Sequence, residues 1–282
     1  MALSNLLTGS LYAVLAFFLI AAFGILTKIA LDGGSPFWIS FIVYSVGTVL
    51  LIPYIVKKGF SFLKSEHYFK LIGRAVFGTI ASVSYTISIQ YIPIVNGTLL
   101  FNTAPVFIPF LMMLFLNKKV QKSTWIAVLI GFIGIIVIVK PTTTIFTEPG
   151  NLIALFSGFS LAIAFILMKL LTATEPIVRI IFYFFSIGML IQIPALFLDT
   201  SKPTSESVIF ALIAGFLLFV GQIALVKGYK YADASKVGIY QYTSVVFVGL
   251  FEWMLWDVVP TGGEFIGVFL VMVAGIIIIR NG

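Results

Sequence analysis

Apolar residues in this chain gather into ten blocks, each long enough to cross a bilayer, and short polar connections separate the blocks. A membrane-spanning helix needs about 20 predominantly apolar residues. The connections carry residues that end helices, as in Asp32-Gly-Gly-Ser-Pro36, Pro141 and Pro176. The pattern therefore predicts an all-α integral membrane protein with ten transmembrane helices. We expect the helices at residues 9–31, 36–56, 70–91, 95–117, 123–140, 150–170, 176–198, 206–230, 234–256 and 262–280.

Composition agrees with this pattern and narrows the chemistry. Hydrophobic residues make up 61% of the 282 residues, charged residues make up 10%, and the mean hydropathy is +1.16. A soluble domain carries about 25% charged residues. There is no cysteine and a single histidine, so we expect no disulfide, no metal site and no cofactor. No HExxH or Walker A motif is present, so we expect neither an enzyme nor an ATP-driven pump.

Positive charges are distributed unequally between alternate connections. The net charge is +7, and fourteen lysine and arginine residues fall on one side, against Lys28, Lys140 and Lys202 on the other. Because cytoplasmic loops of membrane proteins are rich in lysine and arginine, we expect both termini in the cytoplasm. The same rule explains the net charge, so we expect no nucleic-acid partner.

The chain also repeats itself. Residues 9–28 align with residues 150–169 at a spacing of 141, with eight identical pairs, where apolar composition alone would give about two. Residues 91–140 align more weakly with residues 231–280 at a spacing of 140. Each repeat contains five predicted helices, an odd number, so the second repeat is inverted in the membrane relative to the first. The predicted domains are residues 1–141 and 142–282.

Two inverted repeats can exchange conformations, which opens a central site alternately to each side of the membrane. The repeats therefore predict secondary-active or facilitative transport of a small organic metabolite. The expected partners are the lipid bilayer, the metabolite, and protons or an exchanged solute. The alternatives are a drug/metabolite exporter of broad specificity and a channel-like protein, which would show polar rings from several copies. The protein is expected to be a monomer or a homodimer.

Several short motifs resemble one transporter family. They are Arg74 at the start of the third helix, Tyr91-Ile-Pro93, Gly131-Phe-Ile-Gly134, Lys140-Pro141, Lys169, Asp233-Ala-Ser235 and Tyr240-Gln-Tyr242. With these motifs the chain resembles the EamA-type branch of the drug/metabolite transporter superfamily, which implies ten helices in two inverted five-helix repeats. The second half is most similar to bacterial members that carry S-adenosylmethionine, so the expected substrate is an amino acid or an amino-acid derivative. The chain departs from the family at Lys118 and Val258, where many members have glutamate, and at Val43, where many have arginine.

The fourth and ninth helices carry the candidate binding site. One face of the fourth helix presents Thr98, Asn102, Pro105 and Pro109, and the equivalent face of the ninth presents Gly238, Tyr242, Val245, Gly249 and Glu252. The two prolines free backbone carbonyl groups, which must then face protein or a wet cavity. We therefore expect a substrate cavity flanked by Asn102, Tyr242 and Glu252. The alternative is ordinary helix packing with a hydrogen-bonded asparagine and tyrosine.

Four further residues are candidates to line this cavity. On a regular helix Tyr240 and Tyr242 point about 200° apart, so the face argument favours Tyr242, while the family pattern keeps Tyr240 as a candidate. In the third helix Ser82 and Tyr85 share a face, and Gln222 is the repeat mate of Ser82. These three residues either line the cavity or form hydrogen bonds between helices.

The charged residues near helix ends have simpler interpretations. Glu252 is the acidic residue that falls clearly inside a predicted span. Because it lies about 6 Å from the outer end of that span, its side chain is expected to reach the membrane interface. The alternative is a proton carrier or a partner for a cationic substrate. Lys28 is expected to be an interface anchor. Arg74 and Lys227 are expected to be topology determinants at cytoplasmic helix ends.

Overall fold

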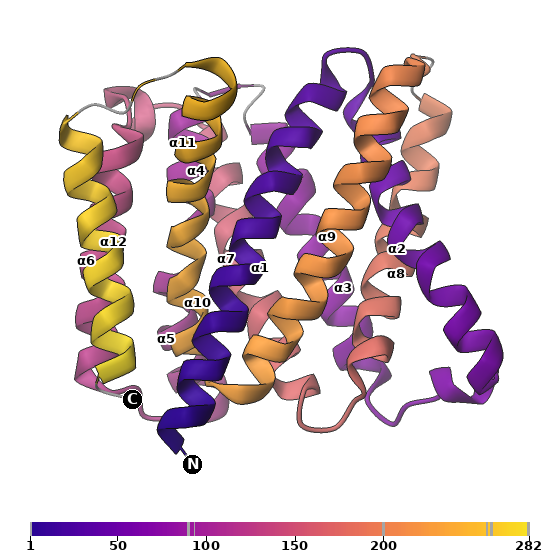
Figure 1. Ribbon diagram of the computed structural model, residues 1–282, viewed down its shortest axis with the longest axis horizontal. Helices are drawn as coiled ribbons and strands as arrows, with labels where there is room; N and C mark the ends of the chain where they lie inside the picture. The colour runs from indigo at the N-terminus through magenta and orange to yellow at the C-terminus, as the bar shows by residue number, and fades with distance from the viewer. Residues whose placement is uncertain are drawn as a thin grey trace.

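The computed structural model describes residues 2–88, 91–92, 94–198, 201–257, 259 and 262–280, and every regular element in those ranges is a helix (Figure 1). Pro93 and Val258, which the family resemblance singles out, lie outside these ranges. The α-helices are α1 (Ala2–Leu31), α2 (Pro36–Lys58), α3 (Tyr68–Ser88), α4 (Ile94–Phe101), α5 (Ala104–Leu116), α6 (Lys122–Val139), α7 (Gly150–Leu171), α8 (Ile177–Leu198), α9 (Ser205–Tyr231), α10 (Ala234–Gly238), α11 (Tyr242–Trp256) and α12 (Gly262–Arg280). Short 3₁₀ turns are η1 (Phe60–Leu63), η2 (Thr143–Phe146) and η3 (Ile239–Gln241).

The expected all-helical membrane fold is confirmed. Among the described residues, nine helical spans are long and apolar enough to cross a membrane. The tenth predicted span, at 234–256, is divided among α10, η3 and α11. The first helix begins at Ala2, earlier than the expected residue 9. The first residue of α1 and the last residue of α12 lie on the same face, at the bottom of Figure 1, which we call the terminal face.

The most extensive helix packing joins one repeat to the other. α1 packs along α9, α3 along α7, α2 along α8 and α6 along α12. The repeat mate of α1 is α7 and that of α9 is α3, so exchanging mates turns the pair α1–α9 into the pair α7–α3. The pairs α2–α8 and α6–α12 each consist of two mates, so the exchange leaves them unchanged. The pairs α6–α12 and α2–α8 lie at the two ends of the bundle in Figure 1. This arrangement is expected of inverted repeats related by a pseudo-two-fold axis in the membrane plane.

Reciprocal contacts between rings and glycines join α2 to α8. The ring of Phe185 lies over Gly47, where an added Cβ atom would come within 2.3 Å of the ring, and the ring of Tyr44 lies over Gly188, at 2.5 Å. The two contacts are repeat mates, since both pairs of positions are related by the spacing of 141 found in the sequence. Small residues are needed here because packing in lipid depends on close approach of helices.

Glycines also bring α6 and α12 into backbone contact. A Cβ atom added at Gly134 would lie 2.8 Å from the carbonyl oxygen of Gly267, and one added at Gly267 would lie 2.6 Å from the carbonyl oxygen of Gly134. Neither clash can be relieved by turning a side chain, because the obstructing atoms belong to the backbone. A methyl group at either position must therefore push the two helices apart.

We expect Gly134→Ala and Gly267→Ala each to destabilise the protein by about 1–3 kcal/mol, the usual cost of overpacking. The matched control is Gly249→Ala in α11, where an added Cβ atom would meet nothing within 4 Å. That control should be neutral or stabilising, because alanine favours helix over glycine by about 0.5–1 kcal/mol. Melting temperatures in detergent check this, and equal values for all three variants would contradict the backbone contact.

Candidate functional site

The fourth transmembrane span is interrupted near its middle. α4 ends at Phe101 and α5 begins at Ala104, with Asn102 and Thr103 between them. Pro105 follows within the first turn of α5, where its missing N–H costs no hydrogen bond. The carbonyl oxygen of Thr98 accepts two hydrogen bonds from Asn102, one from the side-chain Nδ2 at 2.9 Å and one from the backbone N–H at 3.1 Å. The interruption is therefore a built feature of the chain with its own hydrogen bond.

The ninth span changes its winding at the corresponding place. Its backbone passes from α10 through the 3₁₀ turn η3 into α11, and Gly238, Ile239, Gln241 and Tyr242 keep right-handed helical dihedral angles. The last residue of η3, Gln241, is 3% exposed and donates from Nε2 to Oδ1 of Asn102 at 3.3 Å. The short first halves, α4 and α10, lie toward opposite faces of the bundle (Figure 1). The interrupted fourth span and the 3₁₀ turn of the ninth thus meet through one side-chain hydrogen bond.

Tyr85 of α3 contacts α4 beside Asn102. Its hydroxyl group lies 3.0 Å from Oγ1 of Thr98, and its ring centroid lies 5.0 Å from that of Phe101. We use the name crossing cluster for Tyr85, Thr98, Asn102 and Gln241. The cluster contains two of the predicted site residues, Tyr85 and Asn102. Gln241 was missed, although it stands inside the Tyr240-Gln-Tyr242 motif and could have been found there.

The two tyrosines that flank Gln241 contact different helices of the α6–α12 pair. Tyr242 is fully buried with its ring against Gly131 of α6, and within the described residues its hydroxyl group has no hydrogen-bond partner. Tyr240 donates its hydroxyl hydrogen to the carbonyl oxygen of Gly275 in α12 at 3.4 Å. Tyr240 therefore packs between helices, whereas Tyr242 retains an unused buried donor.

Glu252 lies away from the crossing cluster, on the face opposite the terminal face. Its carboxylate pairs with Nζ of Lys28 at 3.2 Å, and the two side chains are 35% and 58% exposed. The Lys28 ammonium also lies 4.7 Å from the ring centroid of Trp256. These three residues, with Ile29 and Asp32, line a hollow of about 190 Å³. This position fits the alternative in which Glu252 reaches the membrane interface.

Ser82 and Gln222, the remaining predicted site residues, have different surroundings. Ser82 is exposed and donates to the carbonyl oxygen of Gly78 at 3.3 Å, whereas Gln222 is buried and accepts a hydrogen bond from Arg74 at 2.7 Å. The expectation that Arg74 is a topology determinant is wrong, because the residue is 3% exposed. Its position near the end of a predicted span resembled that of a surface anchor, and sequence spacing alone does not give its orientation.

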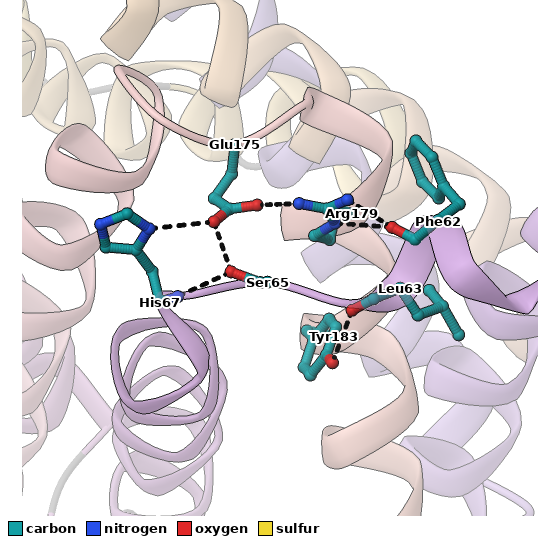
Figure 2. A network of polar contacts seen from close by, with 7 residues as sticks. All are labelled: Phe62, Leu63, Ser65, His67, Glu175, Arg179 and Tyr183. Atoms are coloured by element: carbon teal, nitrogen blue, oxygen red, sulfur yellow. Dashed lines mark hydrogen bonds and ion pairs between the residues drawn. The ribbon is translucent and has the colours of Figure 1, made fainter.

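A network of polar contacts closes the terminal face between the repeats (Figure 2). The carboxylate of Glu175, in the α7–α8 connection, pairs with Arg179 and accepts a hydrogen bond from Ser65, and it lies 3.3 Å from Nδ1 of His67. Arg179 also donates to the carbonyl oxygen of Phe62. The network therefore ties the connection before α3 of the first repeat to the connection before α8 of the second.

The repeat mates of these connections meet on the opposite face. There the backbone N–H of Thr204 donates to the carbonyl oxygen of Gly33 at 2.9 Å. A Cβ atom added at Gly33 would lie 2.7 Å from Oγ1 of Thr204, so the approach is close. The two faces thus have closures at equivalent places, and charged side chains contribute to the one on the terminal face.

Comparisons with known proteins agree with this architecture. The model of the EamA-like transporter family matches residues 7–140 and again residues 148–280. The pseudopaline exporter CntI of Pseudomonas aeruginosa is 28% identical over 282 residues, which cover 100% of this chain and 99% of that protein. The S-adenosylmethionine uptake transporter of Rickettsia bellii is 23% identical over 245 residues, 87% of this chain and 84% of that one. A protein in a solved crystal structure, 15% identical, has the same fold with a TM-score of 0.82 over 96% of each chain.

The terminal-face network should make stability depend on pH. Burial by itself raises the pKa of Glu175, but hydrogen bonds from Ser65 and Arg179 outweigh burial and leave the pKa below its ordinary value. A carboxylate with a lowered pKa stabilises the fold above its unfolded pKa, about 4.3, and this contribution is lost as pH falls through the folded value. We expect Glu175→Gln to cost about 1–3 kcal/mol at neutral pH, with the difference from wild type shrinking below about pH 4.3.

Melting temperatures of wild type and Glu175→Gln across this pH range give the measurement. Glu66→Gln is the matched control, because Glu66 lies in the same connection as Ser65 and is exposed. That control should leave the pH profile unchanged. A gap between wild type and Glu175→Gln that stays constant with pH would contradict the assigned role of the carboxylate.

Proposed function

We propose that this chain, which belongs to the EamA-like transporter family, is a secondary-active or facilitative carrier that moves a small organic metabolite by alternating access. The observation that carries the proposal is the hydrogen bond between Asn102 and Gln241, where the interrupted fourth span of one repeat meets the 3₁₀ turn in the ninth span of the other. In carriers built from inverted repeats, discontinuous helices mark the substrate site near the midplane. The crossing cluster is therefore the proposed site of passage, with residues 1–141 and 142–282 as the two halves that move.

We further propose that the terminal face is cytoplasmic and that the membrane is a bacterial inner membrane. The lysine and arginine residues concentrate in the connections on that face. Alternating access then requires the Glu175 network and the Gly33–Thr204 contact to open in turn. Protons or an exchanged solute are the candidate coupling partners, and the protein acts as a monomer or a homodimer.

The proposed substrate is an amino acid or an amino-acid derivative. Relatives of this chain include an S-adenosylmethionine uptake transporter and a pseudopaline exporter, so the fold serves transport in either direction. S-adenosylmethionine is a suitable first probe, because it combines an amino-acid carboxylate with cationic groups that aromatic rings can contact. An exporter of broad specificity would instead respond to unrelated compounds in the same panel.

The first experiment combines thermal stabilisation with counterflow into proteoliposomes. A ligand that binds the folded state raises the melting temperature, so wild type is screened against amino acids, S-adenosylmethionine and nucleotides. A hit is then tested for saturable uptake that is accelerated by the same compound on the other side. Saturation with trans-stimulation supports the carrier, whereas unsaturable flux through the protein contradicts it and favours a channel.

Tyr242→Phe gives a sharper test of the site. Because the buried Tyr242 hydroxyl group has no partner among the described residues, its removal should leave the unliganded protein equally stable or up to about 1–3 kcal/mol more stable. If this hydroxyl group binds substrate during transport, the same change should lower counterflow about tenfold. Tyr240→Phe is the matched control, since the Tyr240 hydroxyl group already donates to Gly275, and its counterflow should be unchanged. Full counterflow by Tyr242→Phe would remove Tyr242 from the site.

A further inference from the structure

We propose that Arg74 binds the carboxylate group of the transported metabolite. The residues that contact its guanidinium group, which with Arg74 we call the arginine cluster, are Phe184 of α8 and Gln222 of α9. Tyr44 of α2 packs against the ring of Phe184. The inference rests on the proposed function, since it names the chemical group that a carrier of this kind would recognise.

The guanidinium group of Arg74 is enclosed by both repeats. It lies six residues into α3, about 9 Å along the helix axis, and the residue is 3% exposed. Its Nη2 donates to Oε1 of Gln222 at 2.7 Å, and its Cζ lies 3.9 Å from the ring centroid of Phe184. The cation therefore sits inside the bundle, between helices that must separate if the halves move.

This buried charge has no counter-charge in the part of the chain that the structure describes. The ion pairs there involve other residues, and the contacts of the Arg74 guanidinium group are the amide oxygen of Gln222 and the ring of Phe184, which carry no net charge. The acidic residue placed within a span, Glu252, pairs with Lys28 at the opposite face. An unpaired cation inside a membrane protein is costly and marks a functional site with a missing anionic partner.

Arg74 also has a hydrogen-bond donor that is not used. Its Nε atom is buried and has no partner among the described residues. The Nε edge of a guanidinium group matches the two oxygens of a carboxylate. One guanidinium charge balances one carboxylate, whereas a phosphate dianion would need a second cation beside it.

A structural role for Arg74 predicts different behaviour. An arginine that only holds α3 to α9 would stay enclosed in every state and would not distinguish one ligand from another. A carboxylate-binding arginine must become reachable from water when the carrier opens. It must also favour an acid over the matching compound without the acid group. Accessibility and ligand preference therefore separate the two roles.

The first measurement uses wild-type protein in membrane vesicles treated with phenylglyoxal, which modifies arginine, followed by mass spectrometry. The chain has three arginines, and the exposed Arg280 reports that the reagent works. We expect Arg74 to be modified more slowly than Arg280. Protection is measured with matched probes: S-adenosylmethionine against its decarboxylated analogue, and amino acids against their amides. The acids should slow modification of Arg74 at least about tenfold more effectively than their partners.

The second measurement compares ligand affinity, from thermal stabilisation, in wild type, Arg74→Gln and Arg74→Lys. Wild type should favour each bound acid over its partner by about tenfold or more. Arg74→Gln should bring that ratio close to one, and Arg74→Lys, which keeps the charge, should retain part of it. If Arg74→Gln does not fold, Arg74→Lys and the labelling of wild type still decide the matter.

Three results would overturn the proposal: no modification of Arg74 where Arg280 reacts, equal protection or no protection by acids and their partners, or an acid preference that survives in Arg74→Gln. A different result would overturn the proposed carrier function while leaving the carboxylate site in place. If acids protect Arg74 but no probe shows saturable, trans-stimulated flux, the carboxylate site stands and the carrier proposal falls.

Discussion

The middle of a bilayer offers no water, so every backbone N–H and C=O group there must find a partner within the protein. This constraint decides where the chain can be anything other than a continuous helix. In the described part of this molecule, the fourth span breaks where the side chain of Asn102 returns a hydrogen bond to the backbone, and Gln241 reaches across to it from the 3₁₀ turn of the other repeat. The interruption and the proposed site of passage share this place because both need polar groups held inside protein.

The same constraint explains why the repeats bind each other so closely. Apolar side chains gain little by leaving lipid for protein, so association depends on shape and on close approach. Gly134 and Gly267 bring two backbones together, and Gly47 and Gly188 each receive an aromatic ring from the opposite repeat. The large side chains that face outward, such as Phe69 and Leu152, suit the surrounding lipid. Tight contacts thus lie between the repeats, where a change of state must break and remake them.

Much of this fold follows from the sequence, because the length and hydropathy of each block are set by the thickness of the bilayer. The repeat and its inversion were also predictable, since a constant spacing survives divergence better than individual identities do. The interruption of the fourth span and the 3₁₀ turn of the ninth were harder to predict. Pro105 and Pro109 indicated a kink in the fourth span, but the ninth span has no proline, and its 3₁₀ turn depends on packing against the other repeat.

Only some of the site residues were predicted correctly from the sequence. Asn102 and Tyr85 were found because their spacing on a helix is regular, and they do lie in the crossing cluster. Glu252 lies at an exposed ion pair, which fits its expected reach to the membrane interface, whereas Arg74, expected to be a topology determinant at a helix end, is buried. Both lie near span ends, where a rotation of the helix decides between lipid headgroups and protein interior.

The reciprocal ring contacts between α2 and α8 bear on the relative populations of the two end states that alternating access requires. If its two end states are related by the pseudo-two-fold axis, a chain with identical repeats would occupy them equally. The equilibrium constant between the states is then set by the positions where mates differ. Tyr44 and Phe185 fill mutually equivalent places and differ by one hydroxyl group. A hydroxyl group whose bonding changes by about 1 kcal/mol between states shifts their populations about fivefold, so this small asymmetry is enough to give the carrier a resting side.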